Sequence, residues 1–514
     1  MLWFDALDAT PPRCRRRKLS AMSTSRINTA LLNGLILGIL LAIPVLRTLV
    51  PTGNLLTDPD IWWHLRAGQW MVEHGRLPLN DPFSLPGQSA RWVAYSWLFE
   101  VALSEGYRHL GLWAILLCRI LGSMAVILGY FALAWHLTRR FLPSIVLAAL
   151  VVLVITPVLN ERPWLFTILG SQATLGVLLR FQEPGSLPRW VWLLPLVFVL
   201  WANTHIQFVY GLILLAIGLI APLMDRLLPT GFPGTALVAW GPRWWKLAGL
   251  AAGCIAATLA TPFHWHLYEV VVEYATQPGP FRWVNELTAP DFRDLADWVL
   301  LALTCLACVS LRGHSRGSFA WILLAFAVIL GYRARRDGWL VGLAALFIIG
   351  TYLRDRLSSS EEPWPGLFLW VGASLAVLLS LAIASSLRDL SEPALEEVVA
   401  HHYPARAVQH IREHRYPGPL FNPFDWGGYL IWALPEYPVT LDGRTNLHGD
   451  SRIGRHLGVW AGQSTWKTDP DLSGAGLILV PVSTPLYSLL EGDTAYRKTH
   501  EDELAAVFVP ARAK

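Results

Sequence analysis

The stretch Thr57–Trp70, TDPDIWWHLRAGQW, comes directly after the first long apolar run of the chain and holds two acids, Asp58 and Asp60. Pro59 suits the first position of a helix because it has no N–H to leave unpaired, which predicts an N-cap at Asp58 and a first-turn acid at Asp60. From Ile61 onward the apolar residues recur at helical spacing. This pattern predicts a short amphipathic helix on a membrane interface, with its tryptophans at headgroup depth.

The two acids have a structural interpretation and a functional one. Helix capping alone accounts for both of them. A close pair of carboxylates also suits acid–base chemistry or a divalent cation such as Mg²⁺ or Mn²⁺ held by Asp58 and Asp60, and these possibilities stay open. His64 is four residues after Asp60 and shares its helix face, so it joins the candidate site.

Composition decides the class of protein. Of the 514 residues, 54% are apolar and only 15% are charged, and the apolar residues come in long uninterrupted runs. Such a chain is not a soluble domain, and it is predicted to be an α-helical polytopic membrane protein. The net charge of +4 is spread through loops, which gives no nucleic-acid surface. Four of the five cysteines lie inside apolar runs and give no disulfide framework.

About eleven transmembrane helices are expected. The first, Leu31–Val50, lacks a small-residue cleavage site and is predicted to be an uncleaved anchor, with either Met1 or Met22 as the start. The others are expected near Leu112–Trp135, Leu142–Leu159, Trp164–Phe181, Val191–Trp201, Phe208–Met224, Leu247–Pro262, Trp298–Leu311, Phe319–Gly331, Leu340–Leu353 and Leu367–Ala384.

Basic residues orient these helices. Starting from the arginine-rich N-terminal tail, every second loop carries positive charge, which marks the cytoplasmic side. We expect a basic cytoplasmic tail (1–28), a transmembrane domain (29–388) with its first outer loop at 51–110, and an extracytoplasmic α/β domain (389–514).

The last part of the chain alternates between helical and extended patterns, which is typical of a small α/β domain. Helices are expected at Tyr403–His414 and Gly428–Leu434, and strands at Pro419–Phe421, Val439–Leu441, Leu477–Val482 and in a final hairpin that turns near Glu501–Asp502. Gly427–Gly428 and Asp442–Arg444 have the composition of turns. Turn chemistry is therefore favoured over a binding role for Asp442 and Arg444.

One outer loop departs from the charge pattern. Arg333, Arg335 and Arg336 form a positive cluster on the outer side. Anchoring of helix ends by snorkelling is one explanation. A phosphate clamp is the other, because guanidinium groups bind phosphate oxygens bidentately and stay charged when partly desolvated.

Other outer polar residues also have two interpretations. Glu161 and Arg162 either cap the span that follows or contact a substrate. His205 lies in a short outer turn and is either a structural histidine or a ligand-binding one. Asn285 and Glu286 belong to an aromatic loop that either lies on lipid headgroups or walls a pocket.

The order of these motifs resembles the GT-C superfamily of polytopic glycosyltransferases, in particular a broad group of bacterial membrane proteins of that type. The resemblance rests on D-x-D in the first outer loop, WWHLRAGQW, NDPFS and WVAYSWLFEVALSEGY. It extends to RPWLF (Arg162–Phe166), WANTH (Trp201–His205), VNE (Val284–Glu286) and the run from WGGYLIW to LDGRTNLHG (Trp426–Gly449).

The resemblance implies an inverting enzyme of the bacterial inner membrane that moves a sugar from a polyprenyl-phosphate-linked donor to a glycan, lipid or protein acceptor on the outer side. The acidic motif maps onto Asp58 and Asp60. A carboxylate must take the proton of the attacking hydroxyl, for which we favour Asp60, with Asp58 orienting it. Arg335 and Arg336 suit the leaving phosphate, with Arg162 or His205 assisting.

Three alternatives remain. A polysaccharide ligase or polymerase-like protein of envelope assembly would share the outer site and use a long glycan as donor. A secondary transporter would place ionisable residues near the membrane midplane and show repeat-related broken helices, and neither is apparent in the sequence. A non-catalytic scaffold whose tail recruits partners is the third.

Overall fold

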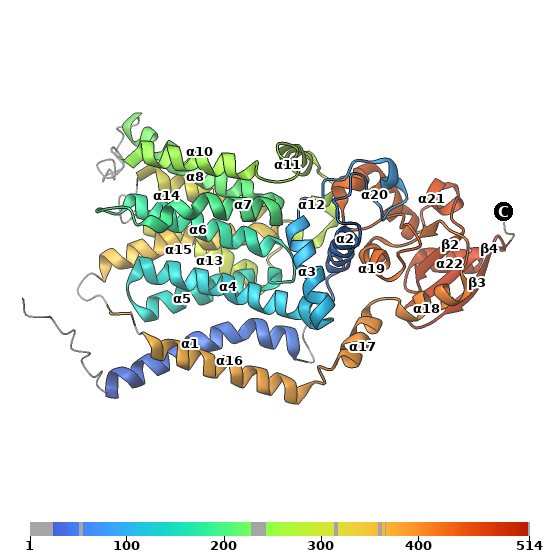
Figure 1. The fold of residues 1–514 in the computed structure, drawn as a ribbon, viewed down its shortest axis with the longest axis horizontal. Coiled ribbons are helices and arrows are strands. Elements are labelled where there is room, and N and C mark those ends of the chain that lie inside the picture. Colours follow the sequence, from blue (N-terminus) through green and yellow to red (C-terminus); the bar gives the residue numbers. More distant parts are fainter. Residues whose placement is uncertain are drawn as a thin grey trace, which may run out of the picture.

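The computed structural model describes residues 24–50, 55–227, 243–312, 317–357, 362–364 and 366–511. Most of the basic tail (1–28), including Met1 and Met22, lies outside the described residues. Figure 1 shows a helical bundle at one end of the molecule and a smaller mixed region, which holds the only sheet of the described ranges, at the other.

Each of the eleven predicted spans contains a helix. These helices are α1 (Thr24–Leu49), α4 (Trp113–Thr138), α5 (Phe141–Ile155), α6 (Trp164–Gln182), α7 (Leu194–Thr204), α8 (Val209–Leu227), α10 (Trp244–Thr258), α13 (Leu295–Arg312), α14 (Gly317–Arg333), α15 (Gly338–Arg356) and α16 (Leu367–Leu387). Within the described ranges, eight apolar helices are long enough to cross a membrane, and two apolar segments, Arg189–Thr204 and Gly317–Arg333, are shorter. The protein is a multi-pass membrane protein, and the count of eleven spans stays a prediction.

Helix α15 is at the centre of the bundle and packs against α4, α5, α13 and α14. Every residue from Gly338 to Gly350 on it is buried. At the edge of the bundle, α1 and α16 run side by side (Figure 1). Their backbones approach closely because glycines face the contact: a Cβ on Gly34 would lie 2.3 Å from the Leu369 carbonyl oxygen. Small residues at such contacts are typical of membrane helix pairs.

Four helices lie between the bundle and the C-terminal part: α2 (Asp60–His74), α3 (Trp97–Leu110), α11 (His266–Thr276) and α12 (Pro280–Trp283) (Figure 1). Helix α2 packs on α3, and Gly68 permits the contact, since a Cβ there would lie 1.9 Å from the Glu100 carbonyl oxygen.

The other face of α2 packs on the C-terminal part, which corrects one prediction. Trp62 is fully buried and its ring contacts those of Tyr403, Tyr429 and Trp432. Trp63 is only 5% exposed. The prediction that the tryptophans of α2 lie at headgroup depth was wrong for Trp62 and Trp63, because protein covers them. The position of α2 at a membrane interface stays a prediction.

The C-terminal part contains a four-stranded sheet in the order β1-β2-β4-β3. Its strands are β1 (Leu420–Phe421), β2 (Leu477–Pro481), β3 (Tyr496–Glu501) and β4 (Ala505–Pro510); β1 pairs with β2 in parallel and the other pairs are antiparallel. The helices are α17 (Glu392–His402), α18 (Ala405–His414), α19 (Phe424–Ala433), α20 (Thr445–Trp460), α21 (Pro470–Ser473) and α22 (Pro485–Glu491). The predicted final hairpin, the strands at 419–421 and 477–482 and the helix at 403–414 are confirmed.

Two local predictions in this part were wrong. Val439–Leu441 is not a strand, since Val439 makes only an isolated bridge to Ser84. Gly427–Gly428 is not a turn but lies inside α19. These glycines allow close approach: a Cβ on Gly427 would lie 2.1 Å from the Leu441 carbonyl oxygen, and one on Gly428 would lie 2.2 Å from that of Pro59.

Candidate active site

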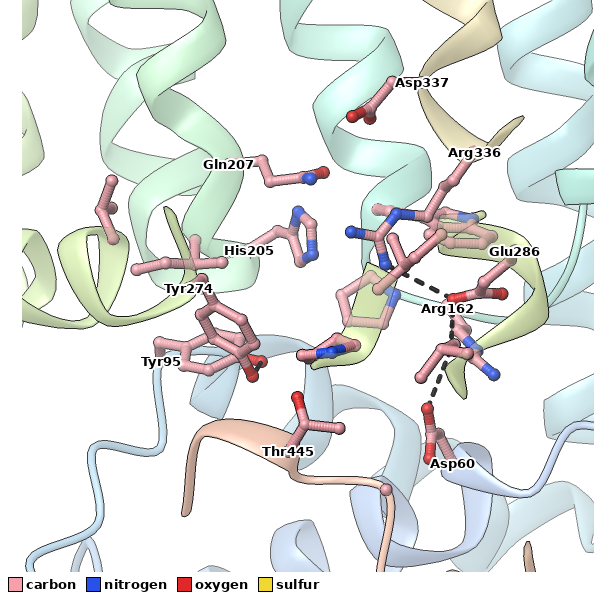
Figure 2. Close-up of a pocket in the computed structure, with 18 of the residues that line it drawn as sticks. Asp60, Tyr95, Arg162, His205, Gln207, Tyr274, Glu286, Arg336, Asp337 and Thr445 are labelled. Atoms are coloured by element: carbon pink, nitrogen blue, oxygen red, sulfur yellow. Dashed lines mark hydrogen bonds and ion pairs between the residues drawn. The ribbon is translucent and has the colours of Figure 1, made fainter. Parts of the chain in front are cut away.

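A cavity of about 300 Å³ lies where α2, α11 and α12 meet the loop that precedes α20. It collects residues that are far apart in the sequence. Of the predicted site residues, those that line it are Asp60, His64, Arg162, His205, Glu286 and Arg336. Figure 2 shows Asp60 and Arg336 in different parts of this cavity, joined through Arg162 and Glu286.

Asp60 is the first residue of α2, where the positive end of the helix dipole favours a carboxylate. Its side chain is 18% exposed, and its Oδ2 lies 2.9 Å from Nη1 of Arg162. Burial raises the pKa of Asp60 to about 6, and the attraction of Arg162 opposes part of this rise. A carboxylate with such a pKa is ionised near neutral pH and still basic enough to accept a proton.

Asp58 does not line the cavity and is held from three directions. Its Oδ1 accepts the Asp60 amide N–H at 3.0 Å, and its Oδ2 accepts from Asn160 Nδ2 at 2.8 Å and from Arg162 Nε at 2.5 Å. Helix α2 begins at Asp60 with Pro59 as its N-cap, so the predicted N-cap at Asp58 is displaced by one residue. Asp58 is 7% exposed, and its carboxylate is taken up by these three donors.

Arg162 connects three acids. Beyond Asp58 and Asp60, its Nη1 lies 3.1 Å from Oε1 of Glu286. Arg162 is in the turn just before α6, whose N-cap is Pro163. The planar fork of a guanidinium can serve several carboxylates at once, which an ammonium group does less well.

The same contacts test the predicted metal site. A divalent cation shared by Asp58 and Asp60 would need free carboxylate oxygens from both. Here Arg162 lies between them, and both oxygens of Asp58 already accept N–H groups. The two acids therefore do not fit a metal ion in this arrangement.

Two other groups of potential metal ligands occur among the described residues. They are Asp291, Asp294 and Asp297, and His456, Asp469 and Asp471. In each group an arginine forms ion pairs with the acids. Arg335 pairs with all three acids of the first group, and Arg455 pairs with Asp469 and Asp471 of the second. Neither group includes the predicted acids.

The arginines of the outer cluster face different surroundings, since some line the cavity and one pairs with acids outside it. Arg336, in the short helix Arg335–Asp337, lines the cavity, lies 5.1 Å from the centroid of the Trp164 ring and is 3.4 Å from Oε1 of Glu286. Arg335 is not among the lining residues. It pairs with Asp291 and Asp294 of the loop before α13 and, at 2.7 Å, with Asp297 in the first turn of α13. Arg333 lines the cavity, although the sequence had not favoured it as a site residue, and lies 4.2 Å from the Phe281 ring centroid.

Two histidines line the cavity in neutral form. His64 Nδ1 lies 2.9 Å from Oε1 of Glu100, and burial holds the pKa of His64 well below its usual value. His205 shares a hydrogen bond of 2.7 Å with the Thr167 hydroxyl, and burial lowers its pKa to about 3. Both rings therefore offer hydrogen bonds instead of positive charge.

Glu161 and Asn285 lie outside the cavity lining. Glu161 is 1% exposed and lies 3.7 Å from Arg119 on α4. Asn285 begins the short helix Asn285–Leu287, and its carbonyl accepts the hydroxyl of Thr288 at 2.7 Å. Neither residue faces the cavity, although Glu161 is close enough to Asp58 and Arg162 for their charges to affect its pKa.

Sequence reasoning missed several lining residues. Tyr95 and Tyr274 place their hydroxyls 3.0 Å apart (Figure 2). Tyr274 also donates to Asn446 at 2.9 Å. Other lining residues that were missed are Gln207, Tyr210, Asp337, Gly443 and Thr445. No local pattern singles them out, because single polar or aromatic residues in loops are common in any chain.

The C-terminal part reaches the cavity through a loop that Arg444 holds. Arg444 is buried, lies 2.7 Å from both Asp81 and Asp442, and also lines the cavity. His448 lies 3.0 Å from the same Asp442. Because its charge is shared by two buried acids, Arg444 fixes the first outer loop to the C-terminal part and positions its neighbour Gly443.

Comparison with protein-family models and with curated protein sequences finds no match. Solved structures do match. One is the archaeal oligosaccharyltransferase AglB from Archaeoglobus fulgidus in complex with an inhibitory peptide and a dolichol-phosphate. The similarity covers 89% of this chain and 69% of the AglB chain, at 12% identity and a TM-score of 0.52. The chain shares the fold of the GT-C glycosyltransferases.

A second match is ArnT from Cupriavidus metallidurans bound to undecaprenyl phosphate, at 14% identity and a TM-score of 0.49, over 95% of this chain and 98% of that one. The fold predicted from the sequence motifs, a GT-C-like membrane bundle with a C-terminal α/β part, is confirmed.

Proposed function

We propose that this GT-C-fold protein is a glycosyltransferase that moves a sugar from a polyprenyl-phosphate-linked donor to an acceptor on the extracytoplasmic side of the bacterial inner membrane. One observation carries the proposal: a single cavity contains a carboxylate with a pKa of about 6 and two arginines from the outer cluster. These are the groups that a base-assisted displacement of a phosphate requires.

The donor's phosphate fits best at Arg333 and Arg336. Guanidinium groups bind phosphate oxygens through paired hydrogen bonds, and both side chains reach the cavity beside aromatic rings. The cavity wall also includes apolar residues from several helices, among them Ile206, Val209 and Leu330. An isoprenoid chain would lie along such a wall. The AglB structure of similar fold is in complex with a dolichol-phosphate, which supports this donor class.

The reaction then follows from the positions of the charged groups. Asp60 accepts the proton of an acceptor hydroxyl as that oxygen bonds to the anomeric carbon, a contribution of typically ~10²–10⁴-fold. The bond from the anomeric carbon to the phosphate oxygen breaks, and its electron pair stays on the phosphate. Arg333 and Arg336 stabilise the growing negative charge. Attack opposite the leaving group inverts the anomeric configuration.

The acceptor would enter beside the C-terminal part. Gly443 and Thr445 come from that part and line the same cavity as Asp60. We assign residues 389–514 to the extracytoplasmic side, because the positive loops of the bundle mark the opposite side as cytoplasmic. Glycan, lipid and protein acceptors all carry hydroxyl or amide groups that suit this site.

The test compares lipid-linked sugars and envelope glycans by mass spectrometry in cells with and without the gene. We expect a lipid-linked sugar to accumulate in its absence and to disappear when the wild type is restored. Asp60→Asn should leave the donor accumulated, whereas the control Asp389→Asn, at an exposed acid, should restore transfer. Restoration of the normal profile by Asp60→Asn at equal membrane levels would contradict the proposal. A long glycan on the accumulated lipid would identify a ligase.

A further inference from the structure

We infer that Arg162 takes the place of a divalent cation between the two aspartates, so that this site works with a resident guanidinium and without a metal ion. The contribution to transfer rests on the proposed function, but the occupation of the position by Arg162 is a property of the chain itself. The inference starts from three ion pairs made by one side chain, to Asp58, Asp60 and Glu286.

The positions of these contacts are those that a bridging cation would use. Nε of Arg162 faces Oδ2 of Asp58 at 2.5 Å, and Nη1 faces Oδ2 of Asp60 at 2.9 Å. A metal ion shared by the two acids would have to displace the guanidinium. The displaced group would then be a partly buried charge without its partners, which is strongly unfavourable.

Asp58 is also committed on its other side. The backbone N–H of Asp60 donates to Oδ1, and Asn160 donates to Oδ2 alongside Arg162. These donors come from α2 and from the loop before α6, so the two segments are fixed relative to each other. Metal coordination by Asp58 would break this connection as well as the ion pair.

A guanidinium leaves the second oxygen of Asp60 available. Arg162 uses Oδ2, and Gly443 is the residue next to Oδ1, where a Cβ would lie only 1.9 Å away. Because glycine has no Cβ, no side chain at position 443 overlaps Oδ1, and this oxygen makes no ion pair with Arg162. A base that forms a hydrogen bond keeps its proton affinity better than one bound to a dication, which lowers the pKa of its ligands.

The other charged groups around Arg162 are consistent with this role. Arg336 shares Glu286 with it, at 3.4 Å, and links it to the expected phosphate position. His64 and His205 face the same cavity but are neutral. Arg162 is therefore the cation that contacts Asp60 directly among the described residues.

Binding of Mn²⁺ alone to the purified full-length protein tests the inference. Electron paramagnetic resonance titration should give the same binding curve for the wild type, Asp58→Asn and Asp60→Asn, because the other acidic groups contribute an equal background. A Mn²⁺ site in the wild type that either substitution abolishes would overturn the inference.

Removal of the guanidinium should create the missing site. Arg162→Ala is expected to gain a Mn²⁺ site that Arg162→Ala/Asp60→Asn lacks, and the control Arg406→Ala, at an exposed arginine, should gain none. A folded Arg162→Ala protein without this gain would contradict the inference. If the variant does not fold, the wild-type titration decides.

Chelation separates this inference from the proposed function. Sugar transfer by the wild type should be unchanged in EDTA, and loss of transfer that Mn²⁺ restores would overturn the role of Arg162 while leaving the enzyme a transferase. Retention of transfer by Asp60→Asn would instead remove the proposed function, and the Mn²⁺ titrations would still report on Arg162.

Discussion

At Asp60 the surroundings set the protonation state in which the residue can work. The carboxylate must be ionised to accept a proton, and burial raises its pKa to about 6. Transfer should therefore fall as the pH drops through 6, by about tenfold per unit well below it, and level off above about pH 7. The pH dependence of kcat/KM measures this directly. An acid limb centred near pH 4, the ordinary range of an aspartate, would contradict the role of Asp60.

Arg335 and Arg336 are neighbours with different partners, so we expect substitution of each to have a different effect on donor binding and on stability. Arg336→Ala should weaken binding of a polyprenyl phosphate by at least about tenfold, because a charge-assisted contact to the phosphate is lost. Arg335→Ala should leave binding within about twofold and lower thermal stability, since three acids lose their partner. Binding can be followed by native mass spectrometry. Equal loss of affinity in both variants would contradict the assignment.

The sequence indicated which residue types gather at this site, but it did not indicate which of them face the cavity. The D-x-D pair and the outer arginine cluster stand out because charge is rare beside apolar runs. Which arginine faces the cavity depends on Asp291 in the loop before α13 and Asp297 in its first turn, about forty positions away in the chain, which bind Arg335. No spacing rule reports such a contact. The sequence favoured Asp60 over Asp58 as the base, but the groups that engage Asp58, Asn160 and Arg162, were not predictable from spacing.

At the scale of elements, the loop before α20 limits the space around the carboxylate of Asp60, the proposed base. A Cβ on Gly443 would lie 1.9 Å from Oδ1 of Asp60, and the side chain of Asp60 can move away more easily than backbone can. Gly443→Ala should therefore lower transfer by at least about tenfold, since small displacements of a catalytic group have large effects. Its thermal stability should stay close to that of the wild type.

The matched control is Gly249→Ala on α10, where a Cβ meets no atom within 4 Å. Alanine favours a helix over glycine, so this variant should keep full transfer and full stability. Normal transfer by Gly443→Ala would show that the loop does not contact the working conformation of Asp60. Both variants are compared at equal amounts in membranes.

Helices were predictable where the apolar pattern is long, as in each of the eleven segments of the bundle. Short elements were less so. Val439–Leu441 has strand composition but bends at Thr440 and meets Ser84 by one isolated bridge. The tryptophans of α2 were assigned to the membrane interface because amphipathic helices cover both lipid and protein with the same residue types. Only the position of α19 decides between them.

At the scale of the whole molecule, Arg444 joins the first outer loop to the C-terminal part. Its removal would leave Asp81 and Asp442 buried without their cation, which costs about 3–5 kcal/mol in comparable buried pairs. Arg444→Ala should therefore lower the Tm of the purified protein and expose the C-terminal part to proteolysis. Arg406→Ala is the surface control. An unchanged Tm would show that this network does not hold the two parts together.

The overall architecture was largely predictable, because composition alone excludes a soluble fold and the last quarter of the chain changes its pattern. The contact between the two parts was not. It depends on glycines that permit backbone approach, such as Gly428 against Pro59, and on a buried network of charges. Composition gives no sign of such contacts, since the same residues are typical of turns.

The most direct measurement is a cryo-electron microscopy structure of the full chain with undecaprenyl phosphate. The account predicts the phosphate inside the cavity that Asp60 also lines, with its oxygens about 3 Å from the guanidinium nitrogens of Arg336. A phosphate bound outside this cavity, with Arg336 still engaged only by Glu286, would contradict it.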